Sequence, residues 1–434
     1  MTNQLNRFQS LAWPTSLVLL CSILGLASTY IGLEQPLIGV GIAYIAAFMT
    51  MAWYRPDIAL MLCFASAPLQ NDLTGTDAES HGKFSISEIH LALTFGVFIL
   101  RQIQVRKLVT LGPLTIPIAI HFAVCLFASV QSFRSNTIIS MAQMGLYMVM
   151  TTMLFASLPR LGETFRGAFY ALMVVGVFLA LVSLTTSETY ILGLHKNGVG
   201  ASIATALVVS IDMWMTSKGR KYRWVSLLAM VILAAGLLHT LSRGAWIFTL
   251  VALLTISYVR RDFKLMFRLA LLLGPVVTIG WFALPQESRD YALGFNTERA
   301  NINARYLSMR YALDQFYRNP VYGVGVGLRK DYDATNIAFA TLAETGVVGL
   351  ATFTMIHVVF VLAMVKVQRH LTPKSPVYAL PALGAGLLMG KFMNGMVDHY
   401  WSRGALMMVW AAAGMGLSAY WYVRHQRNLM QRAI

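Results

Sequence analysis

Long apolar stretches, most of them about 15–22 residues long, alternate with short polar segments along nearly the whole chain. Each stretch is continuously apolar and does not alternate at every second position, so we expect membrane-spanning helices and not barrel strands. The fourteen predicted spans cover approximately 11–32, 36–53, 57–69, 86–103, 113–131, 137–158, 167–186, 198–216, 224–240, 245–259, 265–284, 336–365, 377–396 and 404–423.

The basic residues lie at every second loop between these stretches. Of the 34 Lys and Arg residues, 21 fall in one set of loops, as in the runs 218–223 and 260–268, while the other set is close to neutral. Cytoplasmic loops carry such an excess of positive charge. The net charge of +16 therefore indicates a membrane topology with both termini cytoplasmic, and not a nucleic-acid-binding face.

The composition agrees with this interpretation. The 434 residues are 57% apolar and only 12% charged, which is typical of an integral protein of the lipid bilayer. The chain is predicted to divide into N-terminal transmembrane helices at 1–284 (about eleven), an outer excursion at 285–335, and C-terminal transmembrane helices at 336–434 (about three). The three cysteines lie within apolar runs without disulfide or metal-ligand spacing.

The excursion at 285–335 is too long for a structureless loop, which favours a functional role. Within it, the spacing of Tyr306, Met309, Leu313, Phe316 and Tyr317 predicts an amphipathic surface helix over 298–318. A glycine-rich stretch, residues 319–327, follows the helix.

Polar residues collect at the outer ends of the predicted helices. The set comprises Arg134, His195, Lys196, Arg243, the arginines of the excursion including Arg305, Asn336, Glu344, Asp398, His399 and Arg403. Arg243 lies in a very short turn between two apolar helices, where a charge is costly unless it has a partner. Arginine suits bidentate binding of phosphate, so several arginines at one interface indicate an anionic ligand, with a lipid-linked pyrophosphate as the natural candidate.

Several of these residues belong to motifs that carry a family resemblance. The segments SRGAW at 242–246, NPVYGVGVG at 319–327 (preceded by Arg305) and TNIAFATLAETGVVGL at 335–350 resemble the bacterial O-antigen ligase and polysaccharide polymerase superfamily. The segments HKNGVG at 195–200 and KFSISEIHLAL at 83–93 also resemble that family, and the motifs occur in the same order over most of the chain.

The resemblance implies a GT-C-like glycosyltransferase in the bacterial inner membrane, with its active site facing the periplasm. Its substrates would be an undecaprenyl-pyrophosphate-linked glycan and a sugar acceptor, and transfer would invert the anomeric carbon without metal or cofactor. Their positions in the family motifs imply that Arg243 and Arg305 would hold the pyrophosphate. Arg134, Lys196, Asn336 and Arg403 are further candidates for binding substrate.

One position departs from the resembling ligases, which have histidine before the asparagine that opens the LAETG helix. Here it is Thr335, which cannot act as a base near neutral pH. This leaves three alternatives: another residue acts as the base, the mechanism needs little base catalysis, or the chain is not a ligase. We expect His399 to be the base, oriented by Asp398, with Glu344 as the second candidate.

We therefore expect a polymerase that joins lipid-linked repeat units into exopolysaccharide or O-antigen. O-antigen ligase, which transfers the finished glycan to lipid A-core, is the nearest alternative, and a membrane transporter is a less favoured one. Other polysaccharide-assembly proteins are possible partners, and nucleic acid is not expected to be one.

Overall fold

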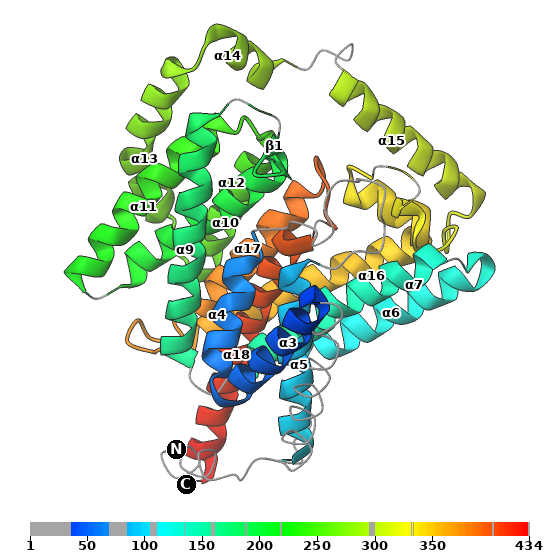
Figure 1. The fold of residues 1–434 in the computed structure, drawn as a ribbon, viewed down its shortest axis with the longest axis horizontal. Coiled ribbons are helices and arrows are strands. Elements are labelled where there is room, and N and C mark those ends of the chain that lie inside the picture. The colour runs from blue at the N-terminus through cyan, green and yellow to red at the C-terminus, as the bar shows by residue number, and fades with distance from the viewer. Residues whose placement is uncertain are drawn as a thin grey trace.

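The computed structural model shows an almost entirely helical protein, with one short β-hairpin in the part of the chain that it describes (Figure 1). The described residues are 36–68, 85–104, 111–133, 135–157, 161–186, 188, 190–217, 219–294, 300–330, 332, 334–401 and 403–432. The predicted first span at 11–32 and nearly all of the polar segment 70–85 lie outside these residues.

The structure confirms a polytopic all-α membrane protein. Within the described residues, nine helices are long and apolar enough to cross a membrane, and two shorter apolar helices lie near the N-terminal end of that part. The remaining predicted spans correspond to shorter or less apolar helices or fall outside the described residues.

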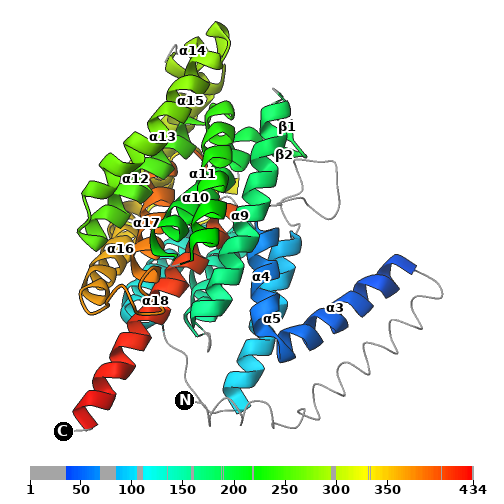
Figure 2. The ribbon, with the colours of Figure 1, turned by 90° about the vertical axis from the view of Figure 1, so that its left-hand side faces the viewer.

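In the first half of the described chain, helices lie at each predicted span from 36–53 to 167–186, although the span 137–158 is divided among three helical elements. These helices are α3 (Pro36–Tyr54), α4 (Pro56–Ser66), α5 (Ile86–Gln104), α6 (Thr115–Ser129), α7 (Ser135–Met144), α8 (Thr152–Ala156) and α9 (Leu161–Thr185). A π-helical turn, η3 (Gly145–Thr151), joins α7 to α8, and the 3₁₀ turns η1 (Gly112–Leu114) and η2 (Val130–Ser132) flank α6. Helix α3 contacts α4 and α5 and extends away from the other helices (Figure 2).

The second half contains the central helices and the excursion. The strands β1 (Tyr190–Ile191) and β2 (Leu194–His195) precede α10 (Lys196–Thr216), α11 (Arg220–His239), α12 (Arg243–Arg260), α13 (Lys264–Ala283), α14 (Gln286–Leu293), α15 (Ala300–Arg318), η4 (Leu328–Lys330), α16 (Ile337–Gln368), α17 (Leu380–Asn394) and α18 (Arg403–Arg432).

Two helices form the centre of the protein. Every residue of α10 from Val199 to Met213 is buried, and so is every residue of α18 from Gly404 to Ala419. Helices α12 and α17 pack closely along each other and link the two. A helix that is apolar on all sides is buried among other helices or faces lipid, and in α10 and α18 protein surrounds the apolar surface.

The excursion contains two helices at the end of the molecule opposite the C-terminal end of α18 (Figure 1). The predicted helix 298–318 is present as α15, whereas α14 was not predicted. Helix α15 packs on α16, with Ala312 and Gln315 buried, while Tyr306 and Tyr317 remain exposed. The predicted apolar stripe is therefore only partly right, because α15 packs on protein through a different, partly polar face.

Helix α16 was predicted as one continuous span, but its backbone is interrupted at Gly346, where φ is +65°. A side chain there would come within 2.1 Å of the carbonyl oxygen of Val321, so only glycine fits. The neighbouring backbone groups are satisfied by the glycine-rich stretch: Val347 N–H donates to Pro320 O, and Val324 N–H donates to Ala343 O. The break therefore fastens the excursion to the first turns of α16.

Candidate functional site

Four central helices meet at the ends that are predicted to lie on the outer side. The N–H of Ile337, at the start of α16, donates to the carbonyl of Gly395, just after α17, at 2.7 Å. At the start of α12, Gly244 lies so close to Asn394 that an added Cβ would be 2.7 Å from its amide nitrogen. These contacts bring the starts of α12 and α16 against the loop that joins α17 to α18.

Asn336 holds this junction with both ends of its side-chain amide. Its oxygen accepts hydrogen bonds from Ala338 N–H and Phe339 N–H and so caps α16, and its nitrogen donates to Met396 O at 2.8 Å. An asparagine at this position satisfies two otherwise free N–H groups of the helix. The structure thus gives Asn336 a positioning role at the site.

His195 and Lys196 begin α10 beside the same junction. The Nδ1 atom of His195 accepts the N–H of Asn197 at 3.2 Å and caps the helix, which leaves the ring hydrogen on Nε2. Burial lowers the pKa of His195; the charge of Asp398 opposes this effect, and the charges of Lys196, His399 and Arg305 add to it. His195 is therefore neutral near pH 7 and presents an Nε2–H donor.

Several charged side chains lie near His195 and affect its pKa. Among them, Lys196 and Arg305 are cations, and Asp398 is the acid that partly balances them. Lys196 lies over the ring of Tyr291, on α14, at 4.7 Å. Helix α14, which the sequence analysis did not predict, therefore covers the start of α10.

Arg243, which was expected in a very short turn between two helices, is the first residue of α12. Its guanidinium donates to the carbonyl oxygen of Gly294 at 3.2 Å, at the end of α14. The side chain is partly buried at the start of the helix.

The loop between α17 and α18 presents Asp398 and His399. Asp398 is 7% exposed and accepts the backbone N–H of His399 at 2.9 Å, whereas His399 itself is exposed. Buried Lys391 donates to Asn394 Oδ1 at 3.1 Å and to the carbonyl of His399 at 2.9 Å. Asp398 and Lys391 therefore hold the main chain at His399 from its two sides.

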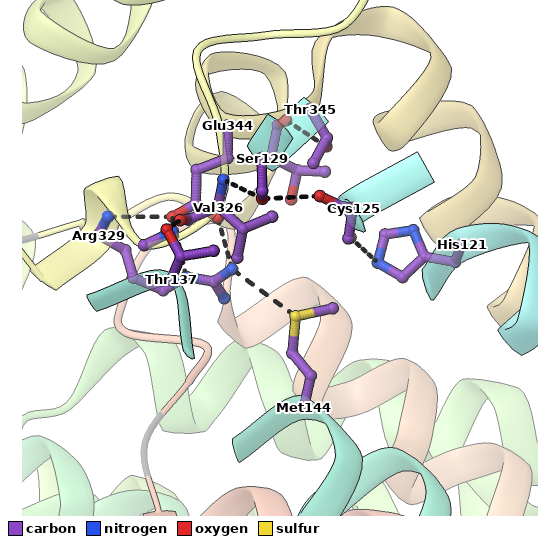
Figure 3. A network of polar contacts seen from close by, with 11 residues as sticks. His121, Cys125, Ser129, Thr137, Met144, Val326, Arg329, Glu344 and Thr345 are labelled. Carbon is purple, nitrogen blue, oxygen red and sulfur yellow. Dashed lines mark hydrogen bonds and ion pairs between the residues drawn. The ribbon is translucent and has the colours of Figure 1, made fainter. Parts of the chain in front are cut away.

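Glu344 lies in a different arrangement from the one predicted for a base (Figure 3). One carboxylate oxygen accepts Gly327 N–H at 3.0 Å, Arg329 N–H at 3.0 Å and Arg329 Nε at 3.1 Å, and the other pairs with the Arg329 guanidinium. Both side chains are nearly buried, and the guanidinium stacks on Trp401 at 4.6 Å. This pair connects the glycine-rich stretch, α16 and the loop that carries His399.

The glycine-rich stretch is bound on its other side by α6 and α7. Ser129 accepts Val326 N–H at 3.2 Å, and Thr137 donates to Val326 O at 2.7 Å (Figure 3). Gly327 has φ of +111° and lies so close to Asn136 that an added Cβ would be 2.8 Å from its carbonyl carbon. The repeated glycines therefore serve close packing between helices.

Most of the predicted site residues lie at this one end of the protein. Lys196, Arg243, Asn336, Asp398 and His399 surround the junction, and Arg305 lies close enough to act on His195. Arg134 lies outside the described residues, and Arg403 is the first residue of α18. The sequence analysis did not predict the contacts made by Lys391, Arg329, Trp401 and Tyr291. Of these four residues, only Lys391 stood out in the sequence, because it is a charged residue inside an apolar span.

The balance of charge at the junction suits an anion. Lys196 and Arg305 are cations near His195, Arg243 begins α12, and Asp398 is an acid near His195. Within the described residues, no group of three or more His, Cys, Asp or Glu side chains could hold a metal ion. These cations suit the binding of an anionic group, and the prediction that no metal is needed stays a prediction.

The fold and this site define a polytopic α-helical membrane protein with a polar, cationic junction at one end of its helices. Residues 228–354 match the O-antigen ligase protein family, and the chain thus contains an O-antigen ligase family domain. Members of this family are glycosyltransferases of the ligase and polymerase type. The matched segment contains Arg243, Arg305, Arg329, Asn336 and Glu344. No curated protein matches the chain.

Proposed function

We propose that the protein is a periplasm-facing polysaccharide polymerase that joins undecaprenyl-pyrophosphate-linked repeat units into exopolysaccharide or O-antigen. The observation that carries this proposal is the cationic junction inside and beside the O-antigen ligase family domain. The positive-inside pattern supports an outer, periplasmic position for the junction, in the bacterial inner membrane.

In the proposed reaction, a hydroxyl oxygen of the acceptor sugar attacks the anomeric carbon of the glycan. The bond from that carbon to the pyrophosphate oxygen breaks, the configuration inverts, and the hydroxyl proton passes to a base. Negative charge grows on the leaving pyrophosphate, so preorganised cations lower the barrier there. Arg243 and Arg305 would hold the pyrophosphate, with Lys196 and the Nε2–H of His195 as additional donors.

His399 remains our candidate for the base. It is exposed at the junction, and its main chain is held by Asp398 and Lys391. In this proposal Asp398 is a positioning residue that acts through the backbone. Glu344 already accepts four hydrogen bonds, which supports an anchoring role and argues against its use as the base.

The test compares arginine variants of the full-length protein in cells at equal expression. Arg243→Lys and Arg305→Lys keep the charge but lose the planar fork, so each should lower polymer formation by about tenfold or more. Arg310→Lys is the matched control, because Arg310 is also an arginine of α15 but is exposed. Wild-type polymer from both Arg243→Ala and Arg305→Ala would refute the pyrophosphate role.

O-antigen ligase is the second candidate, because the matched family is described by that activity. Thr335 at the position of the ligase histidine favours the polymerase, and its side chain is buried in this structure. The glycans of a deletion strain decide between the two. Accumulated single lipid-linked repeats support the polymerase, whereas long lipid-linked chains beside bare lipid A-core support the ligase and contradict our proposal.

A further inference from the structure

A groove lies at the end of the protein opposite the junction, between the last turns of α16 and α18. Its volume is about 650 Å³, within the roughly 300–1,000 Å³ of typical ligand sites. Lys366 and His370 line it from α16 and the turn after it, and Arg424 and Arg427 line it from α18. All four side chains are exposed, and none of the described residues that line the groove is acidic.

The polarity of the groove changes in one direction along both helices. On α16, Val359 and Leu362 line the part nearer the centre of the helix, and Lys366 follows Leu362 by one turn. On α18, Tyr420 precedes Arg424 by one turn, and Arg427 follows. Each wall is thus apolar toward the membrane interior and basic toward the end of the protein.

The surrounding residues place the basic end at a membrane surface. Leu362 is 52% exposed, as expected for an apolar side chain that faces lipid. Trp421 lies beside the groove, with the Arg424 guanidinium 5.5 Å from its ring, and such amphipathic aromatic residues collect at the level of lipid headgroups. The excess of basic residues here predicts the cytoplasmic side.

We propose that this groove binds an anionic phospholipid of the cytoplasmic leaflet. The acyl chains would lie along Val359, Leu362 and Tyr420, and the phosphate would lie between Lys366 and the two arginines. A basic pocket between transmembrane helices on the cytoplasmic side is a recognised way to bind such headgroups. This site is independent of the catalytic proposal, because it lies at the other end of the helices.

The test is thermal unfolding of the purified full-length protein in mild detergent with added lipid. A ligand that binds only the folded state raises the unfolding temperature, and the rise grows with the logarithm of the ratio of ligand concentration to Kd. Phosphatidylglycerol should raise it for the wild type, and phosphatidylcholine should not. Arg424→Gln/Arg427→Gln should weaken phosphatidylglycerol binding by roughly tenfold or more, since each charge near the headgroups is worth about 1 kcal/mol.

The matched control is Arg220→Gln/Lys221→Gln, which removes two exposed basic residues from the start of α11 on the same predicted side. It should respond to phosphatidylglycerol like the wild type. Arg424→Lys/Arg427→Lys should retain most of the response because the charge is kept. Equal responses of the groove and control variants, or an equal response to glycerol phosphate without acyl chains, would overturn the proposal.

Discussion

Substitution of Glu344 should lower the free energy of unfolding if this residue anchors the fold through its ion pair with Arg329. If Glu344 is a catalytic base, its substitution should instead abolish activity with little effect on stability. Glu344 is 2% exposed and accepts two backbone N–H groups and two guanidinium N–H groups. Glu344→Gln keeps an oxygen that can accept the backbone donors but removes the charge. It also turns an amide NH₂ toward the Arg329 guanidinium, so the cation loses its partner.

The expected loss follows from this geometry. Removing one partner of a buried ion pair costs roughly 3–5 kcal/mol, and the low end applies here because the Arg329 side chain is 10% exposed. We therefore expect Glu344→Gln to lower the free energy of unfolding by about 3 kcal/mol. Glu344→Ala should cost more, since an unsatisfied buried N–H group adds about 1–3 kcal/mol.

The assay is reversible unfolding in detergent, combined with polymer formation in cells at matched membrane levels. A double-mutant cycle adds Arg329→Met, which removes the unpaired cation. The double variant Glu344→Gln/Arg329→Met should be about 1–3 kcal/mol more stable than the sum of the two single losses predicts. If Glu344→Gln unfolds within about 0.5 kcal/mol of the wild type and yet makes no polymer, Glu344 is a base and the anchoring argument fails.

Three further predictions follow from the backbone break, the helix cap and the charge pattern. Gly346→Ala should reduce folded protein in membranes, measured by size-exclusion chromatography, because its Cβ would meet Val321 O at 2.1 Å; normal yield would contradict this. Burial lowers the pKa of His195 in the folded protein, so the unfolded chain binds a proton at this residue more readily. The free energy of unfolding should therefore fall as pH drops below about 6.5. His195→Asn should still cap the helix but lose that part of the pH dependence. Reporter fusions after Lys221 and Asn319 should report opposite sides of the membrane, and the same side would refute the topology.

The sequence alone determined the helices and their class, because crossing a membrane imposes a strong local rule. Each span must be about 20 apolar residues with its backbone satisfied internally, so its length and position can be read without knowing its neighbours. The observed ends of α10 and α12, Lys196–Thr216 and Arg243–Arg260, therefore lie close to the predicted spans. The amphipathic helix of the excursion was also predicted, from its 3.6-residue periodicity.

The candidate site could be predicted only as a set of polar residues at the outer helix ends. Their grouping around Asn336 and Asp398 depends on which helices are neighbours, and apolar periodicity carries little information on that in lipid. The break at Gly346 was also missed, since its freed backbone groups are satisfied by Pro320 and Val321, which come from a segment more than twenty residues earlier.

Only the tertiary structure decided what each charged side chain does. Glu344 was the second candidate for the base, and its carboxylate accepts hydrogen bonds from Arg329 and Gly327. Asp398 was expected to orient His399, and its carboxylate accepts the backbone N–H of that residue. A buried charge takes its role from the donors that the fold brings to it, and those donors are remote in sequence.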